Sequence, residues 1–195
     1  MVAQDGKTIY VTGGDYGIYG NQSPGGVIAI NTVTDTSEAQ IQVPDGAVAI
    51  AIAPDGKTIY VTSSITGSGS GEVTPINTTT HTVGTPINVT GNPLAIAITP
   101  DGKTAYVAMD HGPSTSASFA VTPINIATGT AGTSIPVPAG TTGIAIAADG
   151  KTAYVTSSSS PTSHSGEVTP INTTTNTAGT PITIGENAGV IAITP

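Results

Sequence analysis

The chain has 195 residues, of which only 8% are charged, and its 12 acidic residues against 4 lysines give a formal net charge of −8. With this acidic excess and no arginine, it lacks the cationic side chains that nucleic-acid binding requires. The absence of cysteine excludes disulfides and thiolate zinc sites, and no apolar run reaches the ~20 residues of a membrane span or forms a signal peptide.

The string Asp-Gly-Lys-Thr occurs four times, beginning at Asp5, Asp55, Asp101 and Asp149. The copies are 46 to 50 residues apart, and each is followed by an apolar residue and then Tyr-Val. Self-similarity at a fixed period is the sequence signature of a repeat architecture. We therefore expect one domain over residues 1–195, built from four repeats with boundaries near these four positions.

Each repeat contains four short segments with the period-two alternation of a β-strand, named A to D here. In the second repeat, strand A lies within residues 48–54, B within 59–62, C within 72–77 and D within 84–89. Four antiparallel strands every ~46–50 residues are typical of a β-propeller blade. The predicted fold class is all-β: a propeller of four-stranded antiparallel blades, with four repeats in this chain.

The A–B connection is a tight turn in which Asp bonds the backbone and Gly adopts a positive φ. The C–D connection, such as residues 77–82, is a polar turn. Prolines Pro75, Pro123 and Pro170 fall inside strand C, where Pro lacks a ladder donor. We expect a bulge or a shortened strand C at each of them.

The Tyr-Val-Thr that follows Asp-Gly-Lys-Thr, together with the later Val-x-x-Ile-Asn-Thr-x-Thr, resembles the YVTN family of β-propeller repeats. The likeness covers nearly the whole chain. It implies a bacterial or archaeal protein that is secreted or on the cell surface, and many such proteins have no assigned activity. Family members usually have about seven blades, whereas this chain has four repeats and longer B–C loops.

The chain starts at the end of a strand A, and residues 190–195 form a further strand A. We expect this C-terminal strand to complete the first blade and to close the ring by strand exchange. Within one chain, this gives a four-bladed monomer. Between chains, it gives an eight-bladed dimer or a filament, which would be a structural role.

All four lysines lie in A–B turns, each two residues after its own Asp, so this end of the blades is locally neutral. Of the other eight acids, Asp35 and Glu38 lie at the same end and six lie in or beside the B–C and D–A connections. We expect that second end to be the interaction face, because loops on a rigid scaffold carry function. Its candidate residues are Asp15, Tyr16, Tyr19, Asp45, Glu72, Asp110, His111, His164, Glu167 and Glu186.

No catalytic, cofactor-binding or metal-binding motif is visible. Calcium stays open as a ligand, because Asp15, Asp110 and Glu186 would converge near the ring axis in the predicted fold. Tyr10, Tyr60, Tyr106 and Tyr154 recur once per blade. We interpret them as packing residues between neighbouring blades rather than as a ligand cage. His81 is interpreted as a turn residue, because a sister repeat has Asn176 at its position.

The sequence therefore predicts a non-enzymatic, extracellular or cell-surface propeller that binds a protein or a surface glycan through its B–C and D–A loop face. It is expected to be a monomer or to self-associate through its terminal strands. The alternative is a propeller hydrolase or a metal-dependent enzyme with a site at the mouth of the ring, since propellers also host active sites.

Overall fold

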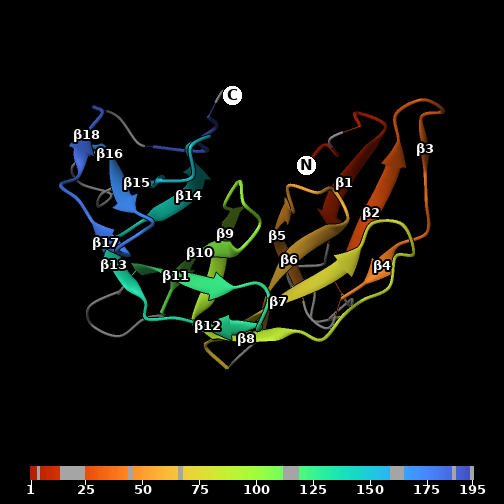
Figure 1. Cartoon of the computed structure of the whole chain (residues 1–195), viewed down its shortest axis with the longest axis horizontal. Helices are drawn as coiled ribbons and strands as arrows, with labels where there is room; N and C mark the ends of the chain where they lie inside the picture. Colours follow the sequence, from red (N-terminus) through yellow and green to blue (C-terminus); the bar gives the residue numbers. More distant parts are fainter. Residues whose placement is uncertain are drawn as a thin grey trace, which may run out of the picture. The chain divides into compact units, whose positions relative to one another are not determined.

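The structure is a computed structural model, and it describes residues 1–3, 5–13, 25–43, 46–65, 68–111, 119–158, 165–185 and 188–193. Every regular element in these residues is a β-strand (Figure 1). None of the described segments forms a helix long and apolar enough to cross a membrane. The chain divides into two compact units, Met1–Thr90 and Gly91–Pro195.

Unit 1 contains two antiparallel sheets, which we call blades 1 and 2. The strands of blade 1 are β1 (Thr8–Gly13), β2 (Gly26–Asn31), β3 (Thr36–Ser37) and β4 (Ile41–Gln42). The strands of blade 2 are β5 (Gly46–Ile52), β6 (Thr58–Ile65), β7 (Ser70–Asn77) and β8 (Ile87–Thr90).

Unit 2 contains blades 3 and 4. The strands of blade 3 are β9 (Asn92–Ile98), β10 (Thr104–Asp110), β11 (Phe119–Asn125), β12 (Thr130–Ala131) and β13 (Ile135–Val137). The strands of blade 4 are β14 (Thr141–Ile146), β15 (Thr152–Ser158), β16 (Gly166–Asn172), β17 (Thr177–Ala178) and β18 (Ile182–Thr183).

The predicted A–B–C–D order within a repeat is confirmed. Blade 2 reads β5-β6-β7-β8 without interruption, and blades 3 and 4 follow the same order. In blades 2, 3 and 4, the pairing of strand A with strand B contains a β-bulge. One residue of strand A has no partner on strand B, and the register shifts there: Val48, Leu94 and Thr142, respectively. A bulge at the same place in three blades bends strand A locally and increases its twist.

The prolines of strand C do not interrupt it, so the predicted bulge or shortening of strand C is wrong. Tyr106 pairs in register with Pro123, and β11 continues on both sides of it. The carbonyl of Pro123 accepts a hydrogen bond from the N–H of Gly132, at 2.7 Å, so the missing donor of the ring faces strand D. It is strand D that is divided there, into β12 and β13.

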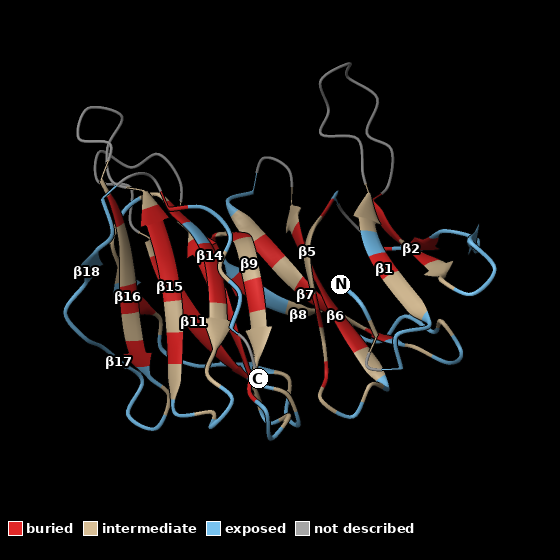
Figure 2. Cartoon of the chain, turned by 90° about the horizontal axis from the view of Figure 1, so that it is seen from above, coloured by how far each residue is buried: buried red, intermediate tan, exposed pale blue. Residues whose placement is uncertain are grey.

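The apolar core of each unit lies between its two blades. In unit 1, Tyr10, Val27 and Ala29 of blade 1 pack with Ile59 and Val61 of blade 2. In unit 2, a second cluster joins Tyr106, Ala108 and Val121 of blade 3 to Val155 and Ile171 of blade 4. Figure 2 shows buried stretches in β15, which alternate with half-buried ones. Blade-to-blade packing therefore supplies the core that a single four-stranded sheet lacks.

The expected completion of blade 1 by the C-terminal strand is not found in the described residues. Residues 1–3 lie beside β1 instead: the Met1 ammonium donates to the Tyr10 carbonyl at 2.9 Å, and the Tyr10 N–H donates to the Met1 carbonyl at 2.8 Å. The edge of β1 is satisfied locally by these bonds. The prediction of a single domain over residues 1–195 remains a prediction.

Candidate functional site

Four of the ten residues predicted for the interaction face lie in the described part of the chain: Glu72, Asp110, His111 and Glu167. The other six lie outside the described residues: Asp15, Tyr16, Tyr19, Asp45, His164 and Glu186. The four described residues lie at the end of strand B, just after it, or near the start of strand C. This is the end of the blades where the sequence placed them, opposite to the A–B turns.

Asp110 and His111 lie at the B–C end of blade 3. Asp110 is the last residue of β10 and pairs with Asn92 on one side and Phe119 on the other. His111 follows directly, and its ring lies over Gly91: a Cβ at Gly91 would be 2.9 Å from the Nδ1 of His111. Gly91 also has a φ of 101°, so this close approach requires a glycine.

Glu72 and Glu167 occupy the same place in blades 2 and 4. Each lies within strand C, opposite a serine of strand B: Glu72 pairs with Ser63, and Glu167 pairs with Ser157. Directly paired residues share a face of a sheet, and this face packs against the preceding blade of the same unit. The sequence placed both glutamates at the first residue of strand C, beside the B–C loop. In the structure each lies near the start of that strand and is half-buried.

Two pairs of buried hydroxyls, one pair in each unit, lie beside these glutamates, and the sequence interpretation missed them. Ser63, Thr74, Ser157 and Thr169 are buried, and their hydroxyl oxygens have no hydrogen-bond partner among the described residues. The signal was present in the sequence as the shared Glu-Val-Thr-Pro-Ile-Asn of two repeats. Nothing in that pattern distinguished a strand face from a loop.

The A–B turns are built as the sequence predicted. In each turn the Asp carboxylate accepts a hydrogen bond from the backbone N–H of the lysine two residues later, at 2.9 to 3.0 Å. The glycine between them has a φ between 67° and 72° in all four turns. The aspartates Asp5, Asp55, Asp101 and Asp149 are therefore turn-forming residues.

The C–D turns have an equally regular construction. In three of them the first Asn accepts hydrogen bonds from the N–H groups two and three residues later, as Asn77 does from Thr79 and Thr80 at 2.9 Å. Four residues after that Asn the backbone is left-handed: Asp35, His81 and Asn176 have φ values of 53° to 56°. The interpretation of His81 as a turn residue is confirmed; its Nδ1 also lies 3.3 Å from Glu38 Oε2.

Two of the four recurrent tyrosines, Tyr10 and Tyr106, pack between the blades of their units, as predicted. Tyr10 is 3% exposed and donates to the carbonyl of Thr78 in the C–D turn of blade 2, at 3.4 Å. Tyr106 is 1% exposed and donates to the carbonyl of Thr173 in the C–D turn of blade 4, at 3.1 Å. Burial raises the pKa of both hydroxyls above 10.0, with nearby carboxylates adding to the effect.

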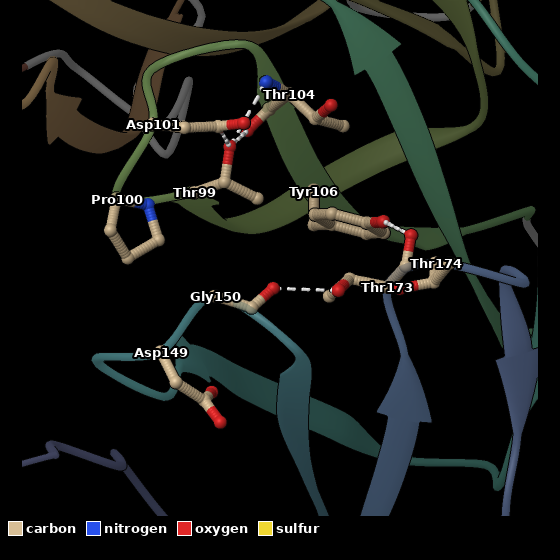
Figure 3. Close-up of a pocket in the computed structure, with 9 residues that line it drawn as sticks. All are labelled: Thr99, Pro100, Asp101, Thr104, Tyr106, Asp149, Gly150, Thr173 and Thr174. Atoms are coloured by element: carbon tan, nitrogen blue, oxygen red, sulfur yellow. Dashed lines mark hydrogen bonds between the residues drawn. The ribbon is translucent and has the colours of Figure 1, made fainter.

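A groove of about 480 Å³ opens between the turns of blades 3 and 4 (Figure 3). Its walls include Pro100, Asp101, Tyr106, Asp149 and Thr173. Figure 3 shows the carboxylate of Asp101 turned toward Thr99, whose hydroxyl donates to it at 2.6 Å. This hydrogen bond, with a second from the N–H of Lys103, lowers the pKa of Asp101 below 3.8. The sequence interpretation had assigned these turns a structural role alone.

The polar groups of this groove are bonded to one another. The Thr173 hydroxyl donates to the Gly150 carbonyl at 2.6 Å, and the Tyr106 hydroxyl lies 2.7 Å from Asn176 Oδ1. Such contacts join two blades, and they present no nucleophile paired with a base. Among the described residues, no group of three or more His, Asp or Glu side chains is placed to hold a metal ion. Asp15 and Glu186, proposed for calcium, lie outside those residues.

No protein-family model matches the chain, and no curated protein matches its sequence. Solved structures are similar to it. Hydrazine synthase of Kuenenia stuttgartiensis matches with a TM-score of 0.78 and 23% identity, over 94% of this chain and 48% of that chain. A functionally unknown protein of Desulfotomaculum acetoxidans matches with a TM-score of 0.66 and 18% identity, over 98% and 56%. TolB of Acinetobacter baumannii matches with a TM-score of 0.63 and 21% identity, over 94% and 43%.

The hydrazine synthase and TolB matches are β-propeller-like proteins, and the likeness establishes the β-propeller fold of this chain. The chain spans about half of the length of the solved chains it matches. Those proteins differ in function, so the similarity concerns fold alone.

Proposed function

We propose that this chain of β-propeller blades is a non-enzymatic binding module, which takes a cationic partner at the B–C and D–A end of its blades. The cationic partner that we propose is a protein surface or a peptide rich in lysine or arginine. The observation that carries the proposal is the separation of charge along the blades. Every lysine lies in an A–B turn beside an Asp, whereas Glu72, Asp110 and Glu167 lie at the other end without a lysine nearby in sequence.

Unit 2 illustrates this separation in one compact body. Its turn end carries Lys103 and Lys151, each following the Asp that accepts its N–H. Its B–C end carries Asp110 and Glu167, both half-buried. A patch of one sign on a rigid scaffold attracts an oppositely charged partner and accelerates its association at low salt.

The proposed location is the cell surface or the extracellular space. The resemblance of the repeats to YVTN repeats supports it. Fractionation of the native organism with an antibody against the chain tests this part. Recovery of the chain only from the cytoplasm would contradict it.

Binding is tested with a fluorescent octalysine peptide, with an octaglutamate peptide as the probe of opposite charge. The octalysine peptide is expected to bind at low salt and to dissociate as salt rises, because exposed charges are screened. The double variant Asp110→Asn with Glu167→Gln should weaken its binding by about threefold or more, since two ion pairs at half-buried carboxylates are each worth at least the ~0.3 kcal/mol of an exposed pair.

A control variant changes the net charge equally at the other end: Asp35→Asn with Glu38→Gln. Both residues are exposed and belong to the C–D end of blade 1. This control should bind octalysine nearly as the unmodified chain does. Equal losses in both variants would mean that only the overall charge matters, and would overturn the proposed face.

A further inference from the structure

Blade 1 exposes an apolar face, whereas the equivalent face of blade 2 is buried. This face, called the leading face, consists of Val2, Ile9, Val11, Ile28 and Ile30, which register places on one side of the sheet. The same positions in blade 2 are Ile59, Val61, Thr74 and Ile76, and all four are 0% exposed. In blade 1, Val11 is 44% and Val2 is 54% exposed. Figure 2 shows the difference between β1 and β6.

The last blade exposes the opposite face. This trailing face contains Tyr154, Val168 and Pro170, because Tyr154 pairs with Pro170 and Thr156 pairs with Val168. The corresponding residues of blade 3, Tyr106 and Val121, are 1% and 0% exposed, since blade 4 covers them. Tyr154 and Val168 are only half-buried. The trailing face of blade 4 therefore has the composition of a blade–blade interface, but no blade among the described residues of unit 2 covers it.

The tyrosine shows what such an interface is built to receive. In each unit, the hydroxyl of the first blade's tyrosine donates to a threonine carbonyl in the next C–D turn: Thr78 for Tyr10, and Thr173 for Tyr106. No hydrogen bond joins the Tyr154 hydroxyl to another described residue. The C–D turn of blade 1 has Thr32 at the position of Thr78 and Thr173, and its Oγ1 likewise donates to a glycine of the A–B turn.

The inner edge of the trailing face already carries a segment of chain. The hydroxyls of Thr142 and Thr156 donate to the carbonyl of Gly189, at 3.1 and 2.8 Å. Thr142 and Thr156 belong to strands A and B of blade 4, and strand A of a following blade contacts the same two strands, as β14 contacts β9 and β10. Residues 188–193 thus lie where a following blade has its strand A.

We propose that a second copy of this chain docks the leading face of its blade 1 on the trailing face of blade 4, with residues 188–193 taking the place of residues 1–3 beside its β1. The occupant is a second copy because the leading and trailing faces have similar residues at the same repeat positions as the two faces of the blade–blade interface inside each unit. None of the residues named for the two faces is charged, so burying the faces leaves no charge unpaired. The Tyr154 hydroxyl then donates to the Thr32 carbonyl of the partner.

This interface is head-to-tail, because two different faces meet. It produces a closed ring of two or more copies, or a filament. It also lies apart from the B–C end, so the proposed cationic partner and the second copy use different surfaces. Failure of octalysine binding and failure of self-association are therefore distinguishable results.

The test measures molar mass by light scattering after gel filtration, over a roughly hundredfold range of concentration. The unmodified chain is expected to exceed its 19.1 kDa mass, and increasingly so at high concentration. Val11→Glu on the leading face and Val168→Glu on the trailing face should each return it to a single-chain mass. Val83→Glu is the matched control, because Val83 is 38% exposed and lies on neither face.

Mixing the two face variants makes the test specific. Val11→Glu keeps an intact trailing face and Val168→Glu keeps an intact leading face, so one interface forms per pair. The mixture should have twice the mass of one chain and no more. Tyr154→Phe, which removes only the hydroxyl, should weaken self-association severalfold and serves if Val168→Glu fails to fold.

A single 19.1 kDa species of the unmodified chain at every concentration would overturn the proposal. So would assembly of Val11→Glu to the same mass as Val83→Glu, or a mixture of the two face variants that stays monomeric although both retain the circular dichroism of a β-protein.

Discussion

The hydroxyl of Tyr106, on β10 of blade 3, lies 2.7 Å from the Oδ1 of Asn176 in the C–D turn of blade 4 and donates a hydrogen bond to it. The same hydroxyl lies 3.1 Å from the carbonyl of Thr173. Asn176 has a φ of 53°, so the left-handed turn that ends strand C also presents its amide oxygen to the neighbouring blade. One contact therefore connects the Tyr-Val motif of one repeat to the turn motif of the next.

Replacing Tyr106 by Phe should lower the free energy of unfolding by about 1 kcal/mol. The substitution keeps the ring and removes a hydrogen bond at a residue that is 1% exposed. Urea denaturation of both proteins measures the difference. Tyr154→Phe is the control: its hydroxyl bonds no described residue, so the single chain should lose much less. Equal losses would mean that the interblade hydrogen bond contributes nothing.

Stability should fall at alkaline pH because of the buried tyrosines. Burial, with the nearby Asp101 carboxylate, raises the pKa of Tyr106 above the ordinary 10.0. Ionisation therefore favours the unfolded chain: stability is complete below about pH 10 and declines as pH rises through the folded-state pKa, by at most about 1.4 kcal/mol per pH unit and tyrosine. Tyr10 and Tyr60 act in the same direction.

Unfolding free energies measured between about pH 8 and pH 12 test this dependence. The slope above pH 10 should be shallower in Tyr106→Phe than in the unmodified chain. A Tyr106→Phe variant that loses stability as steeply would show that other groups carry the alkaline transition.

Alanine at Gly84 should destabilise the protein by about 1 to 3 kcal/mol, as overpacking typically does. A Cβ there would lie 3.0 Å from the Pro75 ring and 3.3 Å from its carbonyl oxygen. The same glycine–proline contact recurs at Gly132 and Gly179. Gly46→Ala on β5 is the control, because no described atom lies within 4 Å of its Cβ. Thermal melts that place Gly84→Ala above Gly46→Ala would refute the steric argument.

Replacing Thr99 by Ala should raise the pKa of Asp101 toward 3.8, because the Thr99 hydroxyl is the largest cause of its depression. The turn should persist, since the Lys103 N–H still donates to the carboxylate at 3.0 Å and sister repeats have Ala53 and Ala147 at this position. NMR titration of the carboxyl carbon measures the shift. An unchanged titration curve in the variant would contradict it.

The same replacement has a defined effect on stability against pH. A carboxyl whose pKa is lower in the folded chain stabilises it above the ordinary pKa, and this contribution disappears as pH falls through the folded-state value. The unmodified chain should therefore lose its advantage over Thr99→Ala as pH falls below the ordinary carboxyl pKa of 3.8 and through the lower folded-state value. The effect is small, because Asp101 is exposed to solvent.

The repeat pattern predicted the blades because its information is local. Alternating small apolar residues define the strands. Asp-Gly defines the A–B turn, and an Asn followed by several Thr residues defines the C–D turn. Asp5 and its three equivalents, and the left-handed position of His81 and Asn176, follow from side-chain to backbone bonds within four residues. No long-range contact is needed to form them.

The prolines and the glutamates show where local reasoning was insufficient. A strand has two edges, and the sequence does not tell which edge the missing donor of Pro123 faces; it faces strand D, so strand D is the one divided. Likewise the sequence placed Glu72 at the start of strand C but did not tell which face of the strand it occupies. Its pairing with Ser63 places it on the face that packs on blade 1.

The sequence by itself determined the four repeats, the order of strands within each and the positions of the A–B and C–D turns, because these depend on neighbours a few residues apart. Only the tertiary structure decided which faces of the blades are buried. Val11 and Val61 are equivalent in the repeat, yet one is 44% and the other 0% exposed. The difference arises because burial depends on a preceding blade, which packs on Val61, whereas no described residue covers Val11 in the same way.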